Sequence, residues 1–274
     1  MDDLLKGLAA GAAALILIHG SLEHHLQQDA TRQVSEAFRG PGTVQVRIAP
    51  EGLFGIFGGD LRAVDVSGER LSVNTLPFAL DPRAGADGSI HHLGLHLRKV
   101  TLSGLPVERF DADVPGLRFD IGRTMRRNAI VLSRAGTGHA EAKITTEGLR
   151  AFILNKYEQT LSDVLVWTQN KKLYILGRAR LFGTPVPFVA SCTLAPRDGR
   201  YVDLTGVTVQ MNGVPMPPQN AAVMTAQFNP VLDIVNDLGL GGYLTMTQVE
   251  IGDGFVTIRG QATLPVAPTQ TGKE

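Results

Sequence analysis

The sequence predicts an α+β fold in which a few amphipathic helices lie on a curved, mainly antiparallel β-sheet. Short runs of alternating apolar and polar residues recur along most of the chain, and this period of two is typical of half-buried strands. Turn-forming pairs such as Asn170-Lys171 and Asp198-Gly199 separate several of these runs. The chain also has 31 glycines, which suits many tight turns between strands.

The composition allows a large core and excludes several classes of protein. The 274 residues are 43% apolar and 19% charged, as in a globular chain. Lysine and arginine together number 26 and balance 26 acidic residues, so no net positive charge attracts nucleic acid. The single cysteine, Cys192, excludes an intrachain disulfide, and its apolar surroundings favour a buried, inert thiol.

Residues 1–20 are predicted to be a signal or anchor segment. Residues 4–18 are apolar apart from Lys6, a length that fits a secretory apolar region or a short membrane anchor. The alternative is a helix buried in the fold, because about 20 residues are needed to span a bilayer. An apolar stripe continues through residues 21–38, so we expect one helix running from the membrane into a single domain at residues 21–265. Residues 266–274 are predicted to be a disordered tail.

The first predicted strand, residues 43–48, leads into an apolar, glycine-rich turn. Leu53, Phe54 and Phe57 crowd into this turn, where a solvated loop would not normally carry them. The turn either folds back to cap the core or forms a hydrophobic lip that touches a membrane or gates a cavity. Further strands are expected at residues 62–67, 71–78, 90–102, 164–168, 173–182, 186–194, 201–209, 245–251 and 255–264.

Two later helices complete the pattern. Thr145-Thr146 is a good N-cap for a helix at residues 147–161, which carries Phe152 on its apolar side. A second helix is expected at residues 220–238, kinked at Asn229-Pro230 because proline removes a backbone donor. Its predicted inward-facing stripe consists of Val223, Phe228, Val231, Leu232, Val235 and Leu238.

No set of residues in the sequence has the spacing of a catalytic, metal or cofactor site. The chain has no nucleophile elbow, phosphate-binding glycine loop or zinc-protease motif. His92 and His96 share a strand face but lie about 13 Å apart, too far for one ion to bridge. The basic cluster, namely Arg123, Arg126, Arg127 and Arg134, is either a solvated face or a site for anionic lipid headgroups.

Several motifs, in their order, resemble the LmeA-like family of bacterial cell-envelope phospholipid-binding proteins. They are TVQVRIAPEGLFGIFGGDLRAVDVSG, AEAKITTEGLRAFI, NGVPMPP, FNPVLDI and VEIGDGFVTIRGQATLP, and the similarity covers residues 44–264. The resemblance implies a strongly curved antiparallel sheet wrapped around helices, similar to tubular lipid-binding domains, with an apolar channel. It also implies an N-terminal membrane segment, a domain outside the cytoplasmic membrane and no catalytic residues.

The first functional hypothesis is therefore a non-enzymatic protein that binds phospholipid or a related lipid and associates with a membrane. Its expected lipid-binding residues are Leu53, Phe54 and Phe57 at the mouth, with Phe152, Phe228, Leu232 and Val235 along the wall. The second is a scaffold that binds a partner protein through sheet edges and the apolar turn at Phe54 and Phe57. The third is an envelope hydrolase or transferase that uses Glu108, Asp111, Asp113 or His92.

Overall fold

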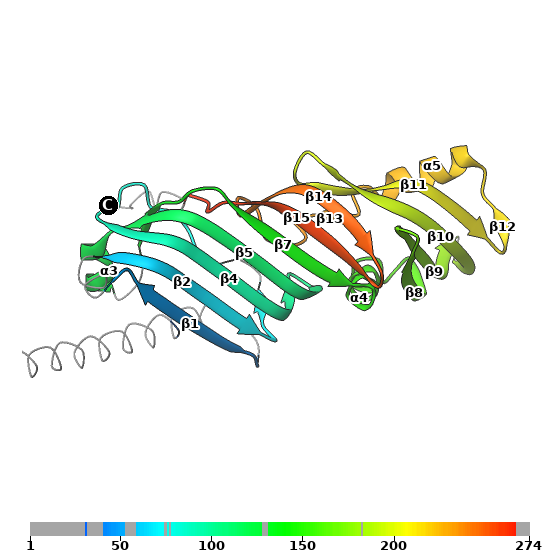
Figure 1. Cartoon of the computed structure of the whole chain (residues 1–274). Helices are drawn as coiled ribbons and strands as arrows, with labels where there is room; N and C mark the ends of the chain where they lie inside the picture. The colour runs from blue at the N-terminus through cyan, green and yellow to red at the C-terminus, as the bar shows by residue number, and fades with distance from the viewer. Residues whose placement is uncertain are drawn as a thin grey trace, which may run out of the picture.

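The computed structural model describes residue 31 and residues 41–52, 59–73, 76, 78–127, 131–181 and 183–266. Two curved β-sheets lie end to end along an elongated molecule (Figure 1). The large sheet contains β1 (Thr43–Pro50), β2 (Asp60–Glu69), β3 (Ser72–Val73), β4 (Gly88–Leu102), β5 (Leu105–Phe119), β6 (Leu132–Arg134), β7 (Gly138–Thr145), β14 (Leu244–Gly252) and β15 (Phe255–Ala262).

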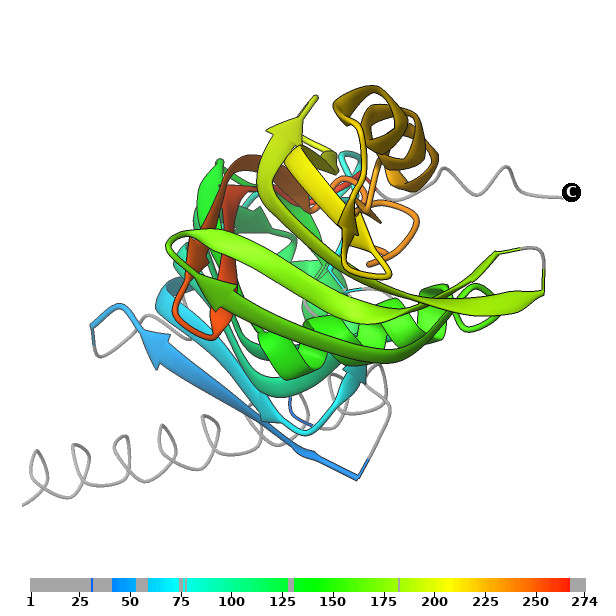
Figure 2. The ribbon, with the colours of Figure 1, turned by 90° about the vertical axis from the view of Figure 1, so that its right-hand side faces the viewer.

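The small sheet forms the opposite end of the molecule, which faces the viewer in Figure 2. It contains β8 (Leu161–Gln169), β9 (Lys172–Leu181), β10 (Thr184–Arg197), β11 (Tyr201–Met211), β12 (Val214–Pro215) and β13 (Leu232–Asp233). The described helices are α3 (Ile121–Arg127), α4 (Thr146–Lys156) and α5 (Pro218–Phe228). Helix α4 contacts both β5 and β8, so it sits where the two sheets meet.

Both sheets are mainly antiparallel, as the sequence predicted. The large sheet has the order β1-β2-β4-β5-β7-β15-β14, in which only the pairing of β4 with β2 and β3 is parallel. The small sheet has the order β12-β11-β10-β9-β8 and is antiparallel throughout. The coarse fold class, α+β with few helices and curved sheets, is therefore confirmed. Within the described residues, no helix combines the length and apolar character that crossing a membrane requires.

Three predicted elements were wrong in extent. Of the strand expected at residues 71–78, the described residues form a strand at Ser72–Val73, while Leu71, Leu76 and Phe78 lie outside strands. The helix expected at residues 147–161 ends at Lys156, and Leu161 begins β8. The helix expected at residues 220–238 ends at Phe228, and the chain continues as β13 and a series of turns. Its predicted apolar stripe also fails at Val223, whose side chain is 66% exposed. The N-terminal segment, the turn at residues 53–58 and residues 267–274 lie outside the described residues.

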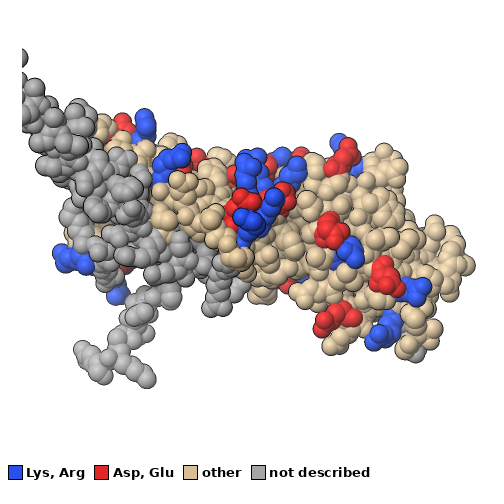
Figure 3. All heavy atoms as spheres, turned by 90° about the horizontal axis from the view of Figure 1, so that it is seen from below, with Lys and Arg blue, Asp and Glu red and all other residues tan. Residues whose placement is uncertain are grey.

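Strand register gives the large sheet one apolar face and one charged face. Residues paired across neighbouring strands point to the same face. One such row crosses six strands and consists of Val46, Val66, Leu95, Ala112, Ala140 and Gly260. The opposite face carries ion pairs such as Arg259 with Glu141 at 2.6 Å. In the view of Figure 3, acidic and basic side chains are likewise interspersed, so neither sign dominates that surface.

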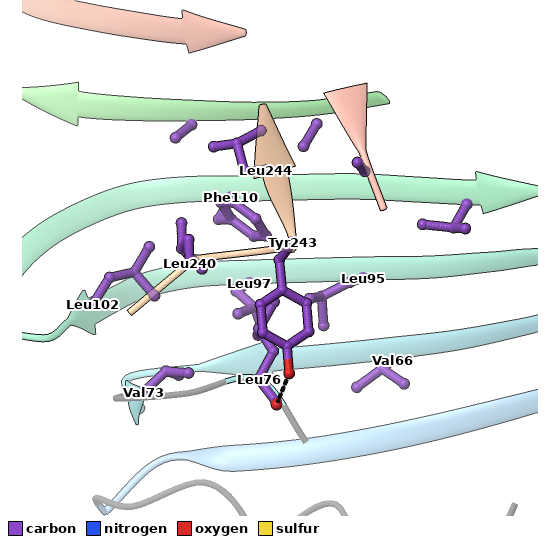
Figure 4. Packing of buried hydrophobic residues seen from close by; sticks show 14 of the residues in the cluster. Val66, Val73, Leu76, Leu95, Leu97, Leu102, Phe110, Leu240, Tyr243 and Leu244 are labelled. Carbon is purple, nitrogen blue, oxygen red and sulfur yellow. Dashed lines mark hydrogen bonds between the residues drawn. The ribbon is translucent and has the colours of Figure 1, made fainter. Parts of the chain in front are cut away.

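Two irregular segments cross the apolar face and close the core. The first contains Leu76, which follows β3, and the second contains Leu240 and Tyr243, all of them buried. Figure 4 shows the two segments meeting where the Tyr243 hydroxyl donates a hydrogen bond to the Leu76 carbonyl, at 2.6 Å. Burial of this ring with its hydroxyl satisfied fixes one crossing segment against the other.

Candidate functional site

Helix α4 brings apolar side chains to the junction of the two sheets. Its N-terminus is fixed by Thr145, whose Oγ1 accepts a hydrogen bond from the Gly148 amide at 3.1 Å, so the predicted N-cap is confirmed. This start places Phe152 and Ile153 on the buried side. At the other end, Lys156 Nζ donates to Asp237 Oδ2 at 2.6 Å and ties the helix to the segment after α5.

The Asn229 side chain holds the segment after α5, because it forms the pair of hydrogen bonds that a neighbouring strand would form with β11. Asn229 accepts a hydrogen bond from the Leu204 amide at 2.8 Å and donates one to the Leu204 carbonyl at 3.0 Å. It thereby satisfies the backbone amide and carbonyl of Leu204 at the edge of β11. The Val231 amide then bonds to the Val202 carbonyl at 2.9 Å, and β13 pairs with β11 from there. Chain pairing along this edge, added to the missing donor of Pro230, ends the helix at Phe228.

Asp233 fixes the turn that follows β13. Its carboxylate accepts a bidentate pair of bonds from Arg200, at 2.8 and 2.7 Å, and one from the Val235 amide at 2.9 Å. The hydrogen bonds from Arg200 are the main cause that lowers the pKa of Asp233 to about 2. Asn236 donates a further bond through its side-chain amide at 2.9 Å. A buried carboxylate with this many donors is a rigid anchor for the loop.

Four of the predicted lipid-binding residues gather around the C-terminal end of α4. Phe152 and Leu232 are buried core residues at 8% and 7% exposure, and Val235 is half-buried against the same core. Phe228 is half-buried and lies edge-on to Tyr157, with ring centroids 5.4 Å apart. The other three, Leu53, Phe54 and Phe57, lie outside the described residues. The structure therefore unites the predicted wall at one place, and its role in lipid binding stays a prediction.

An apolar crevice opens on the large sheet beneath Tyr243. Its volume is about 30 Å³, and it is lined from β4, β5, β7 and both crossing segments by residues that include Leu95, Phe110, Ala112 and Ala140. This space holds about one water molecule and is far smaller than an acyl chain. The row of paired residues across the sheet changes from valine and leucine to alanine and glycine. These smaller residues leave room for the tyrosine ring and for the crevice beneath it.

The family comparison agrees with an apolar site. The profile of the LmeA-like phospholipid-binding family matches residues 20–261. The chain belongs to the LmeA-like family. No curated protein and no solved structure gives a significant match. Membership supports lipid binding in general, with phospholipid as the partner, and confirms the resemblance seen in the sequence motifs.

The crevice residues of this LmeA-like chain were missed by sequence reasoning. Ala112 and Tyr243 belong to no motif, and Ala140, the first residue of the motif AEAKITTEGLRAFI, was not predicted as a site residue because the predictions favoured large apolar side chains. A signal was present, because Ala140 and Ala142 alternate along β7 with alanine where other strands carry valine or leucine. Small residues on the apolar side of a strand indicate that another segment or a ligand approaches closely.

The titratable groups considered for catalysis or metal binding lie on the charged face of the large sheet. His96 Nδ1 is 2.9 Å from Asp111 Oδ1, and His92 Nδ1 is 3.4 Å from Asp113 Oδ1. The two histidine side chains are 51% and 59% exposed. Among the described residues no cluster of three or more potential metal ligands occurs. These groups form cross-strand pairs on a surface and do not converge on the apolar crevice.

Two sequence features remain, the basic cluster and Cys192. Arg123 in the basic cluster bonds to Asp81 at 2.9 Å, whereas Arg134 lies opposite another cation, Arg118, across the pairing of β5 and β6, so the headgroup role of the cluster stays a prediction. Burial raises the pKa of the Cys192 thiol to about 11, as expected for an inert cysteine in a core strand.

Proposed function

We propose that this LmeA-like protein is a non-enzymatic phospholipid-binding protein of the bacterial cell envelope. In this proposal the domain lies on the extracytoplasmic side, attached to the cytoplasmic membrane by residues 1–20. Acyl chains lie between the apolar face of the large sheet and the segments that cross it. In this proposal the curved sheets and helices enclose the acyl chains, as the sequence resemblance implied.

The observation that carries the proposal is the row of small residues beneath Tyr243. Ala112 and Ala140 form an apolar floor across two neighbouring strands, and the crevice above them is lined almost wholly by apolar side chains. An acyl chain needs only such a wall, since each methylene transferred from water contributes about 0.8 kcal/mol. Few headgroup contacts are then required.

The binding-competent state requires the crossing segments to separate from the sheet. The crevice of about 30 Å³ is the closed form of the site. Segments without regular secondary structure open at lower free energy than strands within a sheet, so the segment that contains Tyr243 is the part expected to move. Phe152, Phe228, Leu232 and Val235 extend the wall toward the small sheet, and Leu53, Phe54 and Phe57 are proposed for the mouth.

The first prediction is that filling the crevice releases bound lipid. Ala140→Leu places a larger side chain at the crevice floor, where Ala140 is 4% exposed, so phospholipid that co-purifies with the full chain should fall at least about tenfold. The measurement is lipid extraction and mass spectrometry after gel filtration.

Ala142→Leu is the matched control. Ala142 lies on the same strand and face and is 7% exposed, but it does not line the crevice. Both variants overpack the core at a similar cost of about 1–3 kcal/mol. If both variants lose lipid equally while folded, or if the wild-type chain carries no lipid and takes none from vesicles, the proposed site is wrong.

A scaffold that binds a partner protein is the second candidate. The observation that favours it is the small volume of the crevice, since a filled core is what a scaffold requires. A stable protein complex that survives delipidation of the chain would support this alternative over a lipid-binding role.

A further inference from the structure

The exposed apolar residues of the described chain gather on the small sheet and α5. Of the seven large hydrophobic side chains that are exposed, only Val266 lies outside this unit. Four of them share one part of the small sheet: Leu165 at 56%, Trp167 at 37%, Leu176 at 38% and Val189 at 36% exposure. Scattered surface hydrophobes need no explanation, but a contiguous group on one sheet face does.

Strand register shows that these side chains point the same way. Leu165 pairs with Leu176, and Leu176 pairs with Val189, so the three form one row across β8, β9 and β10. The adjacent row begins with Trp167 and Tyr174, whose rings stack with centroids 5.3 Å apart. A shallow groove of about 460 Å³ runs along the first row. We call this surface the outer face of the small sheet.

Charge on the outer face has one predominant sign. Along β9 the outward positions alternate with buried ones and place Lys172 on one side of the two rows, with Arg178 and Arg180 on the other. Asp163 lies 3.6 Å from Arg178 as its ion-pair partner. The next positions on β10 and β11 are uncharged, namely Ser191, Thr208 and Gln210. The apolar rows are therefore flanked by three cations against one carboxylate.

We infer that the outer face of the small sheet docks on an anionic lipid bilayer. A stacked tryptophan and tyrosine suit the boundary between headgroups and acyl chains, because their rings are apolar with a polar edge. Leucine and valine side chains beside them enter the apolar layer, while Lys172, Arg178 and Arg180 meet the anionic headgroups. The inference rests on this face alone and does not depend on lipid bound in the crevice.

Trp167 is the only tryptophan of the chain, so its fluorescence reports on this face directly. The full chain is titrated with vesicles of phosphatidylcholine alone and with vesicles that also contain phosphatidylglycerol. We expect the Trp167 emission to shift to shorter wavelength with the anionic vesicles and to be quenched when their acyl chains are brominated. High salt should reduce the shift, because the three cations act through screened charge.

Two variants test the residues. Leu176→Glu should weaken the partitioning measured at Trp167 by at least about tenfold, since it removes an apolar contact and adds a negative charge. Lys172→Gln should weaken it by about fivefold on anionic vesicles only. Val223→Glu is the matched control, because Val223 is 66% exposed on α5 and does not line the groove. This control should bind as the wild type does.

Several results would overturn the inference. They are an unchanged emission with anionic vesicles, an equal shift with neutral vesicles, or an equal loss in the Leu176→Glu and Val223→Glu variants. A shift that grows with protein concentration in the absence of lipid, together with dimers in sedimentation, would assign the face to a second copy of the chain instead. Lipid extraction from the same samples reports on the crevice independently, so the two proposals fail separately.

Discussion

At the scale of single residues, the most constrained polar group described is the carboxylate of Asp233. It is buried at 8% exposure and receives hydrogen bonds from Arg200, from the Val235 amide and from Asn236. Its role is to hold the loop that leads into the crossing segment with Tyr243. Together with the Lys156–Asp237 ion pair, this carboxylate therefore orders the segment that leads to Tyr243.

This dependence predicts a loss of stability in acid. The pKa of Asp233 is lowered from 3.8 to about 2 in the folded chain, so its ionised form stabilises the fold above about pH 4 by roughly 2 kcal/mol. That contribution is lost as the pH falls from about 4 through 2. Asp233→Asn should cost about 2–3 kcal/mol in urea unfolding at pH 7, and the difference from wild type should shrink at pH 2.

Asp198→Asn is the matched control for this prediction. Asp198 also contacts an arginine, Arg197, at 3.3 Å, but its side chain is 71% exposed. Its backbone φ of 55° is one that asparagine tolerates, so the exchange should change stability by less than about 0.5 kcal/mol. An Asp233→Asn chain as stable as wild type at pH 7 would contradict the anchoring role.

At the scale of elements, hydrophobic periodicity located most strands but misjudged where three elements begin or end. Strand β5 was largely missed because its alternation of buried and exposed residues is interrupted. Glu108 and Arg109 are consecutive and both exposed, so the buried positions shift by one residue there. The helix predicted to reach residue 238 fails for a different reason. Leu232 and Leu238 are buried as predicted. The helix nevertheless ends before them, because the Asn229 side chain forms hydrogen bonds to β11. Hydrophobic periodicity does not reveal such a contact.

The Asn229 contact gives a prediction for this boundary. Asn229→Ala leaves the amide and carbonyl of Leu204 without their side-chain partner, so the free energy of unfolding should fall by about 1–2 kcal/mol. Hydrogen exchange at the Leu204 amide should also accelerate. Asn220→Ala on α5 is the control, because Asn220 is exposed and alanine favours helix, so it should leave stability unchanged or slightly raised. Equal stability of both variants would show that pairing along β11 alone ends the helix.

At the scale of the whole molecule, the sequence predicted a class of architecture and a family but not the division into two sheets. Which strands pair depends on contacts between residues far apart in the chain, as in the parallel pairing of β2 with β4. The predicted wall residues converged because the buried face of α4 and the segment after α5 meet at the junction of the sheets. The crevice floor was not foreseen, because the importance of Ala112 and Ala140 arises only when their strands lie side by side.

The last prediction concerns membrane attachment of the whole chain. The family profile begins at residue 20, close to the end of the predicted signal or anchor segment at residues 1–20. The full chain should therefore fractionate with membranes and resist extraction by high salt, since an apolar segment is insensitive to screening.

A chain that starts at Ser21 should unfold cooperatively on heating and keep its co-purifying lipid. It should also be released from anionic membranes by salt, because the outer face of the small sheet is the attachment that we propose for the remaining chain. Two results would contradict this division into an anchor segment and a folded domain. They are release of the full chain from membranes by high salt, and failure of the chain that starts at Ser21 to fold.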